Sequence, residues 1–398
     1  MAQPACPAAA PSTAGVRPEV ADIFRLFGPA FLSREHLPPQ VAKVLRNIIR
    51  CRTAALGGHE SVCQECGDSW LHYNSCFDRH CPTCQGRLAV VWTSEQVERL
   101  VPTHHFHVVS TCPAELRPLA LANQRLVYDL LFHAVRDTLL ELAASRWEAL
   151  PAITAVLHTW NRQMEYHPHV HCIVTGGGLS FDGKRWVPCR PGFLFPVKVL
   201  SALLRGKFMH GFLRAYEAGK LRFVGTSAHL EDPEAFAALR RTLYDANWNV
   251  YAKPPFGDAE QTIRYLSRYT HRVAISSSRL VSVDPDAIVF TTHKPHTCRL
   301  QPHEFIRRFL LHVLPFRFRK IRPYGLSAPS NVHTRLPIAQ RLAASLGRRR
   351  RRARPEDPSP TVPQRPRRPQ VGDQCPTCGI GILVRLPLPL ARAPPVPP

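Results

Sequence analysis

The sequence predicts an α+β protein in which a small, cysteine-rich N-terminal domain precedes a larger domain made of an antiparallel sheet flanked by helices. The chain has 398 residues, of which 44% are hydrophobic, which is enough for two or three domains with a large core. Apolar residues alternate along the chain between helical spacing and the period of two that is typical of strands. Two closely spaced cysteine pairs near the N-terminus indicate a small unit stabilised by metal.

Composition divides the chain into four regions. Residues 1–17 are rich in Pro, Ala and Ser and are expected to be disordered. Residues 18–98 are expected to form a helical and zinc-binding domain, and residues 99–325 a larger catalytic domain. Residues 326–398 are expected to form a basic, Pro-rich and largely disordered tail.

The spacing of apolar residues predicts the individual helices and strands. The expected helices cover residues 20–50 (in two pieces separated by Pro38 and Pro39), 87–100, 116–150, 196–213, 232–246, 259–269 and 303–314. The expected strands cover residues 104–111, 153–160, 168–175, 273–276 and 288–290, with a hairpin at 179–186 and a strand running into a loop at 248–255.

The chain carries a formal net charge of +23, and its arginine-rich tail accounts for only part of this charge. Such a charge favours a polyanionic partner, either nucleic acid or an acidic membrane surface, although charge alone does not specify DNA. No apolar run reaches the length of a transmembrane helix, and the N-terminus lacks the pattern of a signal peptide. We therefore expect a cytoplasmic protein without a membrane-spanning segment.

Thirteen cysteines in a cytoplasmic protein indicate metal ligands rather than disulfides. Two CxxC pairs have the spacing of a zinc ribbon, and a closed shell of four thiolates indicates a structural Zn²⁺ with the ligands Cys63, Cys66, Cys81 and Cys84. Two more cysteines and two histidines could hold a second ion, or could be free thiols and surface imidazoles: Cys51, His59, Cys76 and His80. A further CxxC pair, at residues 375–378, has no apparent partners.

Three histidines alternate with other residues at His167, His169 and His171. On a strand, alternate side chains point to one face, so His169 and His171 would present two imidazoles with Cα atoms about 7 Å apart. Imidazole is a common metal ligand, and the pair is therefore a candidate site for a divalent ion. The alternative is that these histidines lie in a loop before a strand and have no function.

Two tyrosines, Tyr265 and Tyr269, are four residues apart in an expected helix, which puts them on one helix face. Arg268 and Arg272 stand beside them and would offset the charge of a phosphate group. A tyrosine can attack a phosphodiester and form a covalent intermediate. The alternative is that one or both rings pack in the core or stack on bases.

Together these residues resemble the two-tyrosine HUH transposases of rolling-circle insertion sequences, the insertion-sequence-ninety-one group. The resemblance covers most of residues 20–325 in order, and its matching segments are residues 51–59, 74–76, 79–82, 167–171, 251–257, 265–276, 304–309 and 312–315. It implies an N-terminal zinc-binding domain and an HUH endonuclease domain that acts on single-stranded DNA ends.

The resemblance also implies roles for individual residues. His169 and His171 match the HUH metal pair, and Tyr265 and Tyr269 match the nucleophiles. Two residues are candidates for a third metal ligand, and the first of them could instead orient the pair: His167 and Gln261. Four basic residues are the expected DNA contacts: Arg79, Lys253, Arg268 and Arg272.

The expected function is that of a bacterial DNA transposase that nicks and rejoins single-stranded DNA at element ends and target through 5′-phosphotyrosine intermediates. It would bind structural Zn²⁺ and catalytic Mg²⁺ or Mn²⁺, and DNA would be its partner. Two alternatives remain open. One is a plasmid replication initiator or relaxase with the same chemistry, and the other is a non-catalytic zinc-ribbon DNA-binding protein from a decayed element.

Overall fold

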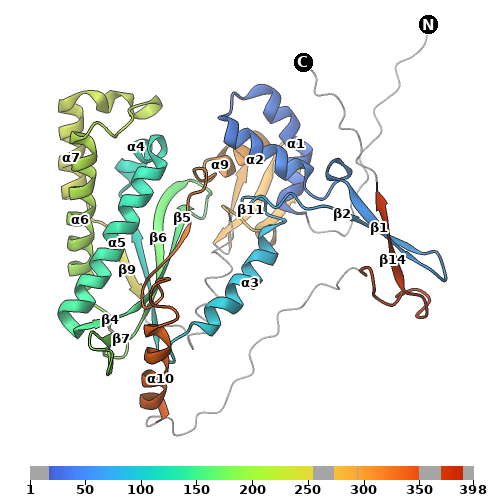
Figure 1. Cartoon of the computed structure of the whole chain (residues 1–398). Helices are drawn as coiled ribbons and strands as arrows, with labels where there is room; N and C mark the ends of the chain where they lie inside the picture. Colours follow the sequence, from blue (N-terminus) through green and yellow to red (C-terminus); the bar gives the residue numbers. More distant parts are fainter. Residues whose placement is uncertain (1–17, 254–272, 294, 349–368, 389–398) are drawn as a thin grey trace.

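The structure, a computed structural model, describes residues 18–253, 273–293, 295–348 and 369–388. Figure 1 shows an elongated arrangement with a layered sheet and helices at one side, a smaller group of helices and strands in the middle, and a narrow three-stranded sheet at the other side.

The largest sheet has five strands, each antiparallel to its neighbours, in the order β13-β5-β6-β3-β9. These strands are β3 (His105–Thr111), β5 (Ala152–Trp160), β6 (Tyr166–Thr175), β9 (Val250–Lys253) and β13 (Ile321–Gly325). The two longest, β5 and β6, pair along most of their length. Because alternate side chains of a strand point to opposite faces, one face of this sheet packs on helices and the other carries the histidines.

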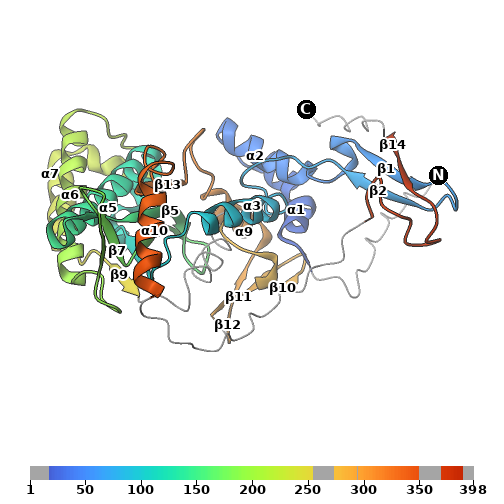
Figure 2. The ribbon, with the colours of Figure 1, turned by 60° about the horizontal axis from the view of Figure 1, so that its bottom comes forward.

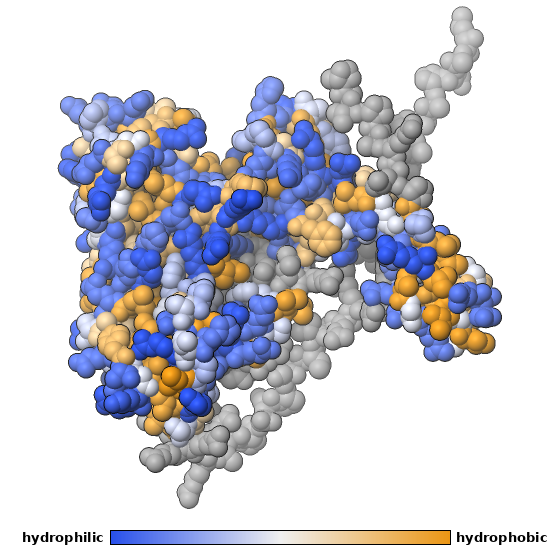
Figure 3. All heavy atoms as spheres, in the orientation of Figure 1, coloured by the Kyte–Doolittle hydropathy of each residue, from blue (hydrophilic) through white to orange (hydrophobic). Residues whose placement is uncertain are grey.

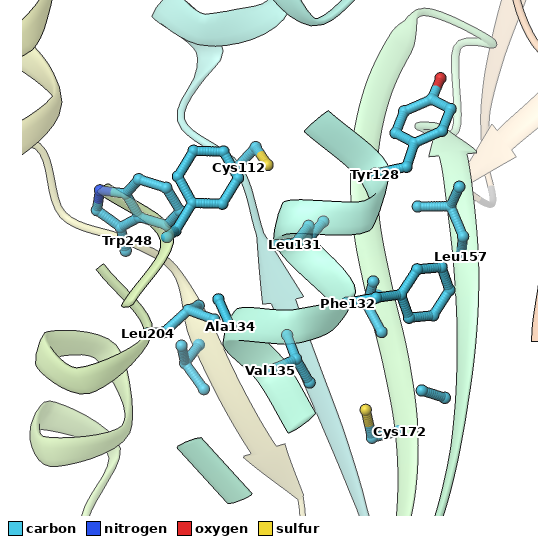
Figure 4. Close-up of a cluster of buried hydrophobic side chains, with 14 of the residues drawn as sticks. Cys112, Tyr128, Leu131, Phe132, Ala134, Val135, Leu157, Cys172, Leu204 and Trp248 are labelled. Carbon is cyan, nitrogen blue, oxygen red and sulfur yellow. The ribbon is translucent and has the colours of Figure 1, made fainter. Parts of the chain in front are cut away.

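Helices cover one face of the sheet and form the main core with it: α4 (Arg117–Ala122), α5 (Gln124–Trp147), α6 (Val197–Glu217) and α7 (Pro233–Asp245). Helix α5 buries apolar residues at spacings of three and four, among them Leu131 and Val135. In Figure 4 these two side chains lie between Leu157 and Cys172 of the sheet on one side and Trp248 on the other. The helical periodicity of α5 therefore determines which face of the sheet is buried.

The N-terminal helices pack on a much later part of the chain. They share one core with a small antiparallel sheet and a helix: α1 (Val20–Arg34), α2 (Pro39–Arg50), β10 (Leu280–Val283), β11 (Ile288–His293), β12 (His296–Leu300) and α9 (Pro302–Leu310). Phe24 of α1 meets Phe309 of α9 edge to face, with ring centroids 4.7 Å apart. Figure 2 shows this group apart from the five-stranded sheet. The core joins residues from both sides of the boundary expected at residue 98.

A third sheet combines the beginning and the end of the chain. Its strands, β1 (Gly58–Cys63), β2 (Ser69–Tyr73) and β14 (Leu383–Leu388), lie in the order β14-β1-β2. Strands β1 and β14 are antiparallel, with Cys63 opposite Leu383. We call this unit, residues 58–73 and 369–388, the ribbon. Figures 1 and 2 both show it at one end of the molecule.

The remaining elements complete the larger body. Strands β4 (Ala149–Leu150), β7 (Gly177–Ser180) and β8 (Trp186–Pro188) form a small sheet that packs on α10 (Arg335–Arg348). Helix α3 (Gln85–Glu98) contributes Trp92 and Val97, which pack on Ile173 of β6. The short 3₁₀ helices are Ala54–Leu56, Ala114–Leu116, Gly225–Glu231 and Ser277–Arg279.

The predicted α+β class with antiparallel sheets is confirmed. Two parts of the expected tail differ from the prediction, because residues 335–348 form a helix and residues 383–388 form a strand. Residues 273–276 are an irregular buried segment rather than a strand, since Ala274 has a left-handed φ of +54°. The expected helix 259–269 and the N-terminal segment 1–17 lie outside the described residues. In the described ranges, no helix combines the length and the apolar character needed to cross a bilayer.

Gly325 stands at the end of β13, where the chain has no room for a side chain. Its φ is +60°, and a Cβ atom there would lie 2.0 Å from the carbonyl oxygen of Pro151. We expect Gly325→Ala to lower the free energy of unfolding by about 2 kcal/mol or more, because it adds backbone strain and a steric clash. The matched control is Gly183→Ala, since Gly183 has a φ of +73° but no neighbouring atom within 4 Å of its Cβ position. Chemical denaturation compares the two, and equal losses would argue against the clash.

Two histidines are buried as neutral groups within the folded body. His312 lies 3.2 Å from the Thr159 hydroxyl through Nδ1, and its Nε2–H donates to the carbonyl oxygen of Met164 at 3.1 Å. Burial lowers the pKa of His312 to about 4, and it does the same for His105. Burial therefore keeps each ring uncharged at neutral pH, although the hydrogen bonds to backbone carbonyls act in the opposite direction.

This burial predicts acid destabilisation. The unfolded chain takes up protons at these histidines near pH 6.5, whereas the folded chain does so only near pH 4. The stabilisation is complete above about pH 6.5 and is lost as the pH falls, by roughly 1.4 kcal/mol per pH unit for each histidine. In His312→Gln, which cannot titrate, we expect the loss of unfolding free energy between pH 7 and pH 5 to be smaller by about 2 kcal/mol. Urea titrations of the wild-type protein and the variant measure this difference, and protonation of other groups affects both proteins equally. A pH dependence that is the same in both proteins would contradict the low pKa of His312.

Candidate functional site

Three imidazoles come together on the sheet face opposite α5. His169 and His171 belong to β6, and His158 belongs to the neighbouring strand β5. The antiparallel register sets His158 directly across from His169, and residues in this relation point to the same face. One nitrogen from each of the three rings lies within 4.8 Å of the other two. Small ring rotations would bring these nitrogens to the spacing of roughly 3 Å found around a single bound ion.

Hydrogen bonds orient two of these rings so that Nε2 remains for a ligand. The Nδ1–H of His169 donates to the carbonyl oxygen of His167 at 2.7 Å. The Nδ1 of His171 lies 2.8 Å from Nε2 of His107 on β3, and the two rings stack. The Nε2 of His171 is buried and has no hydrogen-bond partner among the described residues. Such an atom is costly unless something binds it, so the donor set fits a divalent metal ion.

Burial also sets the protonation state of the cluster. It lowers the pKa of His169 to about 4, and it lowers the pKa of His158 and of His171 well below the usual value for histidine. The neighbouring imidazoles contribute further because their charged forms would repel each other. All three rings are therefore neutral at physiological pH, which is the form that binds metal ions.

His167, the first histidine of the motif, does not join the cluster. Its Nδ1 accepts a hydrogen bond from Nη2 of Arg117 at 2.8 Å, and its backbone carbonyl holds the ring of His169. Its ring also lies beside that of His169, with centroids 5.3 Å apart, but it adds no nitrogen to the group of three. The other candidate for a third ligand, Gln261, lies outside the described residues. Among the described residues, the third imidazole is that of His158.

Sequence reasoning missed both His158 and His107, although each lies in an expected strand. A signal for His158 was present, because the short connection between two expected strands predicts a hairpin that sets His158 opposite His169 or a near neighbour. The position of His107 depends on β3 pairing with β6, which is distant in sequence. No local pattern of residues predicts that pairing.

Two basic side chains lie beside the cluster, whereas a third, Arg79, contacts another part of the protein. Lys320 Nζ is 4.9 Å from the centre of the Trp160 ring, which in turn stacks on His158. Arg117 contacts the motif through His167. Arg79, an expected DNA contact, instead donates to the backbone carbonyls of the loop after α9, those of Pro315 and Phe318. Its guanidinium therefore links two parts of the protein.

The other expected site residues lie outside the described residues: Tyr265, Tyr269, Arg268 and Arg272. Lys253, the last expected DNA contact, ends β9, and its backbone pairs with His107. Val273 is the first described residue after the segment 254–272, which carries the tyrosines. It belongs to the same core cluster as Met164, which lies in the connection between β5 and β6. Both flanks of the tyrosine-bearing segment are thus adjacent to elements of the imidazole cluster.

A first group of four thiols lies where α2 ends and α3 begins. It consists of Cys51, Cys76, Cys81 and Cys84, with all Sγ atoms within 4.8 Å of one another. The Sγ of Cys84 is 3.5 Å from that of Cys51 and 3.7 Å from that of Cys76. A tetrahedral zinc ion with bonds of about 2.3 Å separates its sulfurs by about 3.8 Å, whereas a disulfide brings them to about 2.05 Å. The spacing fits zinc.

A second group of four thiols lies in the ribbon. It consists of Cys63, Cys66, Cys375 and Cys378. The sequence predicted one zinc site made of the two N-terminal CxxC pairs, and this prediction is wrong. Cys63 and Cys66 belong to one cluster, and Cys81 and Cys84 belong to the other. The β1–β2 hairpin carries the first pair away from the helices, while the second pair stays beside α3.

The two histidines that were candidates for zinc binding lie in neither thiol cluster. His80 uses both ring nitrogens within the protein, since Nδ1 contacts the Asp78 carboxylate at 3.0 Å and Nε2 accepts from the backbone N–H of Leu314. The ring of His59 stacks on that of His72, with centroids 4.9 Å apart. The second site expected from the sequence therefore contains Cys51 and Cys76, as predicted. Cys81 and Cys84 occupy the places that were expected for the two histidines.

Comparisons with known proteins agree with this organisation. Residues 23–112 match the family described as "Transposase zinc-binding domain", and residues 152–335 match the family described as "Putative transposase". No solved structure matches the chain significantly. The two matched ranges contain the first thiol cluster and the three imidazoles, respectively.

Two relatives cover most of the chain. The "Putative transposase y4qJ" of Sinorhizobium fredii is 44% identical over 317 residues, which are 77% of this chain and 80% of the relative. The "Transposase for insertion sequence element IS801" of Pseudomonas savastanoi pv. phaseolicola is 28% identical over 300 residues, which are 72% of this chain and 70% of the relative. The chain thus belongs to the IS91 family of insertion-sequence transposases, with the zinc-binding domain of that family preceding its transposase domain.

Proposed function

We propose that this transposase nicks and rejoins single-stranded DNA at the ends of its element through 5′-phosphotyrosine intermediates, in a rolling-circle type of transposition. The observation that carries the proposal is the cluster of three neutral imidazoles, His158, His169 and His171, in which no other part of the chain that the structure describes forms a hydrogen bond with the buried His171 Nε2. Mn²⁺ or Mg²⁺ bound there would polarise a phosphate oxygen and offset charge that develops during the reaction. The cytoplasm of a bacterial cell, which contains the DNA substrate, is the proposed place of action.

The proposed nucleophiles are Tyr265 and Tyr269. The phenolic oxygen forms a bond to the scissile phosphorus, and the bond from that phosphorus to the 3′ oxygen of the preceding nucleotide breaks. The phenolic proton passes to solvent, and the 3′ oxygen takes up a proton to become a free hydroxyl. Attack of a 3′ hydroxyl on the phosphotyrosine reverses the step and rejoins DNA without an external energy source. Two tyrosines allow a second strand to be cut while the first remains attached.

The connectivity of the chain supports bringing the tyrosines to the histidines. The backbone of Lys253 pairs with that of His107, whose ring contacts His171. The segment that carries the tyrosines therefore begins at the end of β9, which is separated from the β6 imidazoles by β3 alone. Tyr265 follows Lys253 by twelve residues, and such a span covers roughly 18 Å even when it is fully helical. This reach is sufficient for the tyrosine to return across the sheet.

The surroundings of the cluster support a single-stranded polyanionic substrate. Arg117 and Lys320 provide positive charge beside the imidazoles. Tyr251 of β9 is 50% exposed and pairs with Val109, which in turn pairs with His171, so the ring lies on the same sheet face as the cluster. An exposed aromatic ring near the reaction centre suits the stacking of unpaired bases. We propose that the substrate strand passes over this face.

We expect His158→Ala to weaken Mn²⁺ binding at least 10-fold and to reduce cleavage of a labelled single-stranded oligonucleotide at least 100-fold, because it removes one of three ligands. Binding of the oligonucleotide should change little, since the remaining cationic residues are intact. Calorimetric titration with Mn²⁺ and a gel-based cleavage assay measure the two effects.

The matched control for this prediction is His167→Ala, on the neighbouring strand. The His167 ring is not one of the three proposed ligands, and the variant keeps the backbone carbonyl that orients His169, so it should retain Mn²⁺ affinity within about threefold. If His167→Ala lost as much affinity as His158→Ala, or if His158→Ala bound Mn²⁺ normally, the proposed ligand set would be wrong.

A second experiment tests the nucleophiles. We expect the wild-type protein to form a covalent adduct with a single-stranded oligonucleotide from an element end, visible as a shifted band after denaturing electrophoresis. The double variant Tyr265→Phe with Tyr269→Phe should form none, because neither phenol remains to attack the phosphate. Tyr251→Phe serves as the control and should retain the adduct. An adduct that persists in the double variant would refute the assignment.

A further inference from the structure

Beyond the DNA chemistry, we infer that the ribbon binds a zinc ion of its own, which joins the N-terminal part of the chain to its last described segment. The proposed ligands are two cysteines from each part: Cys63, Cys66, Cys375 and Cys378. The matched zinc-binding domain ends at residue 112 and so does not include the second pair. The inference rests on the construction of the two turns, the spacing of the sulfurs, the fit between the two parts and the small size of the ribbon core.

The two cysteine pairs lie in turns of the same construction. Each pair has the sequence CxxCG, and the two glycines, Gly67 and Gly379, have φ values of +75° and +69°. The N–H of Gly67 donates to the carbonyl oxygen of Cys63 at 3.1 Å, and the N–H of Gly379 donates to that of Cys375 at 2.9 Å. A left-handed glycine in this place lets the chain turn tightly and point both sulfurs of a pair to one side.

Backbone N–H groups point at the sulfurs of both turns. The N–H of Cys66 lies 3.5 Å from Sγ of Cys63, and the N–H of Gly381 lies 3.4 Å from Sγ of Cys378. Donors in this position stabilise a thiolate, which is the form of cysteine that binds zinc. Each half of the cluster therefore has one sulfur that receives a backbone donor, the first cysteine of one pair and the second cysteine of the other.

The sulfurs of the two halves have the spacing that zinc requires. The Sγ atoms of Cys63 and Cys378 are 3.7 Å apart, and those of Cys66 and Cys375 are 3.6 Å apart. These distances are close to the roughly 3.8 Å between two sulfurs of a tetrahedral zinc site and far from a disulfide bond. The paired residues are separated by 315 and 309 positions in the sequence.

The backbones of the two halves fit closely against each other. The antiparallel pairing of β1 with β14 sets Cys63 opposite Leu383 and leads directly into both turns. A Cβ atom on Gly381 would lie 2.3 Å from the Cys63 sulfur, so only glycine allows this approach. The hydroxyl of Thr377 also donates to the carboxylate of Asp68 across the junction. These contacts align the four sulfurs.

The ribbon has too little apolar core to fold without such an ion. Its buried cluster consists of Cys63, Cys375 and Leu383, with Trp70 packed at the side. Other apolar side chains of the ribbon are exposed: Leu71, Ile380, Ile382 and Leu386. Figure 3 shows hydrophobic surface on the ribbon, at the right. A core of this size cannot offset the entropy of ordering three strands, and small domains of this kind depend on metal binding to fold.

Zinc content of the full-length protein tests the inference. We expect two zinc ions per chain, because each thiol cluster supplies four ligands. The variant Cys375→Ser with Cys378→Ser should contain one. The matched control is Cys298→Ser, which should retain two, since Cys298 lies on β12 and belongs to neither cluster. The wild-type protein with a single zinc ion would overturn the inference.

Alkylation of the native protein, mapped by mass spectrometry, identifies which thiols lose their ion. In the double serine variant, Cys63 and Cys66 should react freely while the four thiols beside α3 stay protected. Gly381→Val keeps all eight thiols and should speed the release of one zinc ion to a chelator at least 10-fold, leaving the other unchanged. Continued protection of Cys63 and Cys66 in the double variant, or loss of protection at the four thiols beside α3 in either variant, would overturn the assignment.

Discussion

The antiparallel pairing of β5 with β6 is the interaction on which the rest of the molecule depends. One face of this pair contributes Leu157 and Val170 to the main core, and the other face carries His158 and His169. A shift of the pairing by one residue would exchange the two faces, since side chains alternate along a strand. Burial of the apolar face against α5 therefore also determines which imidazoles meet. The free energy of the core and the geometry of the imidazole cluster have the same structural origin.

Local periodicity predicts most of the elements of this fold but few of their contacts. The apolar spacing in α5 and the alternation in β3, β5 and β6 depend on neighbouring residues, so they can be read from the sequence. The contact of Phe24 with Phe309 cannot, because it depends on how the whole chain packs. Ala274 shows a further limit, since apolar residues predict burial at that position but not its left-handed backbone.

The same distinction explains what the sequence reveals about the site. His169 and His171 are recognisable because they alternate on one strand, whereas His158 comes from the strand beside it. The cysteines are recognisable as zinc ligands by their CxxC spacing, but spacing does not determine which pairs combine. Cys63 and Cys66 lie close in sequence to Cys81 and Cys84 and yet meet a pair from the far end of the chain. Short-range patterns identify ligands, and only the tertiary structure assigns them to sites.

The pairing of β1 with β14 has a consequence for biosynthesis. Strand β1 is made early, while β14 ends at residue 388, so one side of β1 stays without its neighbour while the roughly 325 residues after Cys63 are translated. At about 5–20 residues per second, the delay amounts to roughly 15–65 s. During that time the nascent chain presents an open strand edge, which is a known route to aggregation. Ribosomes that stop early would release polypeptides in which this edge is never covered.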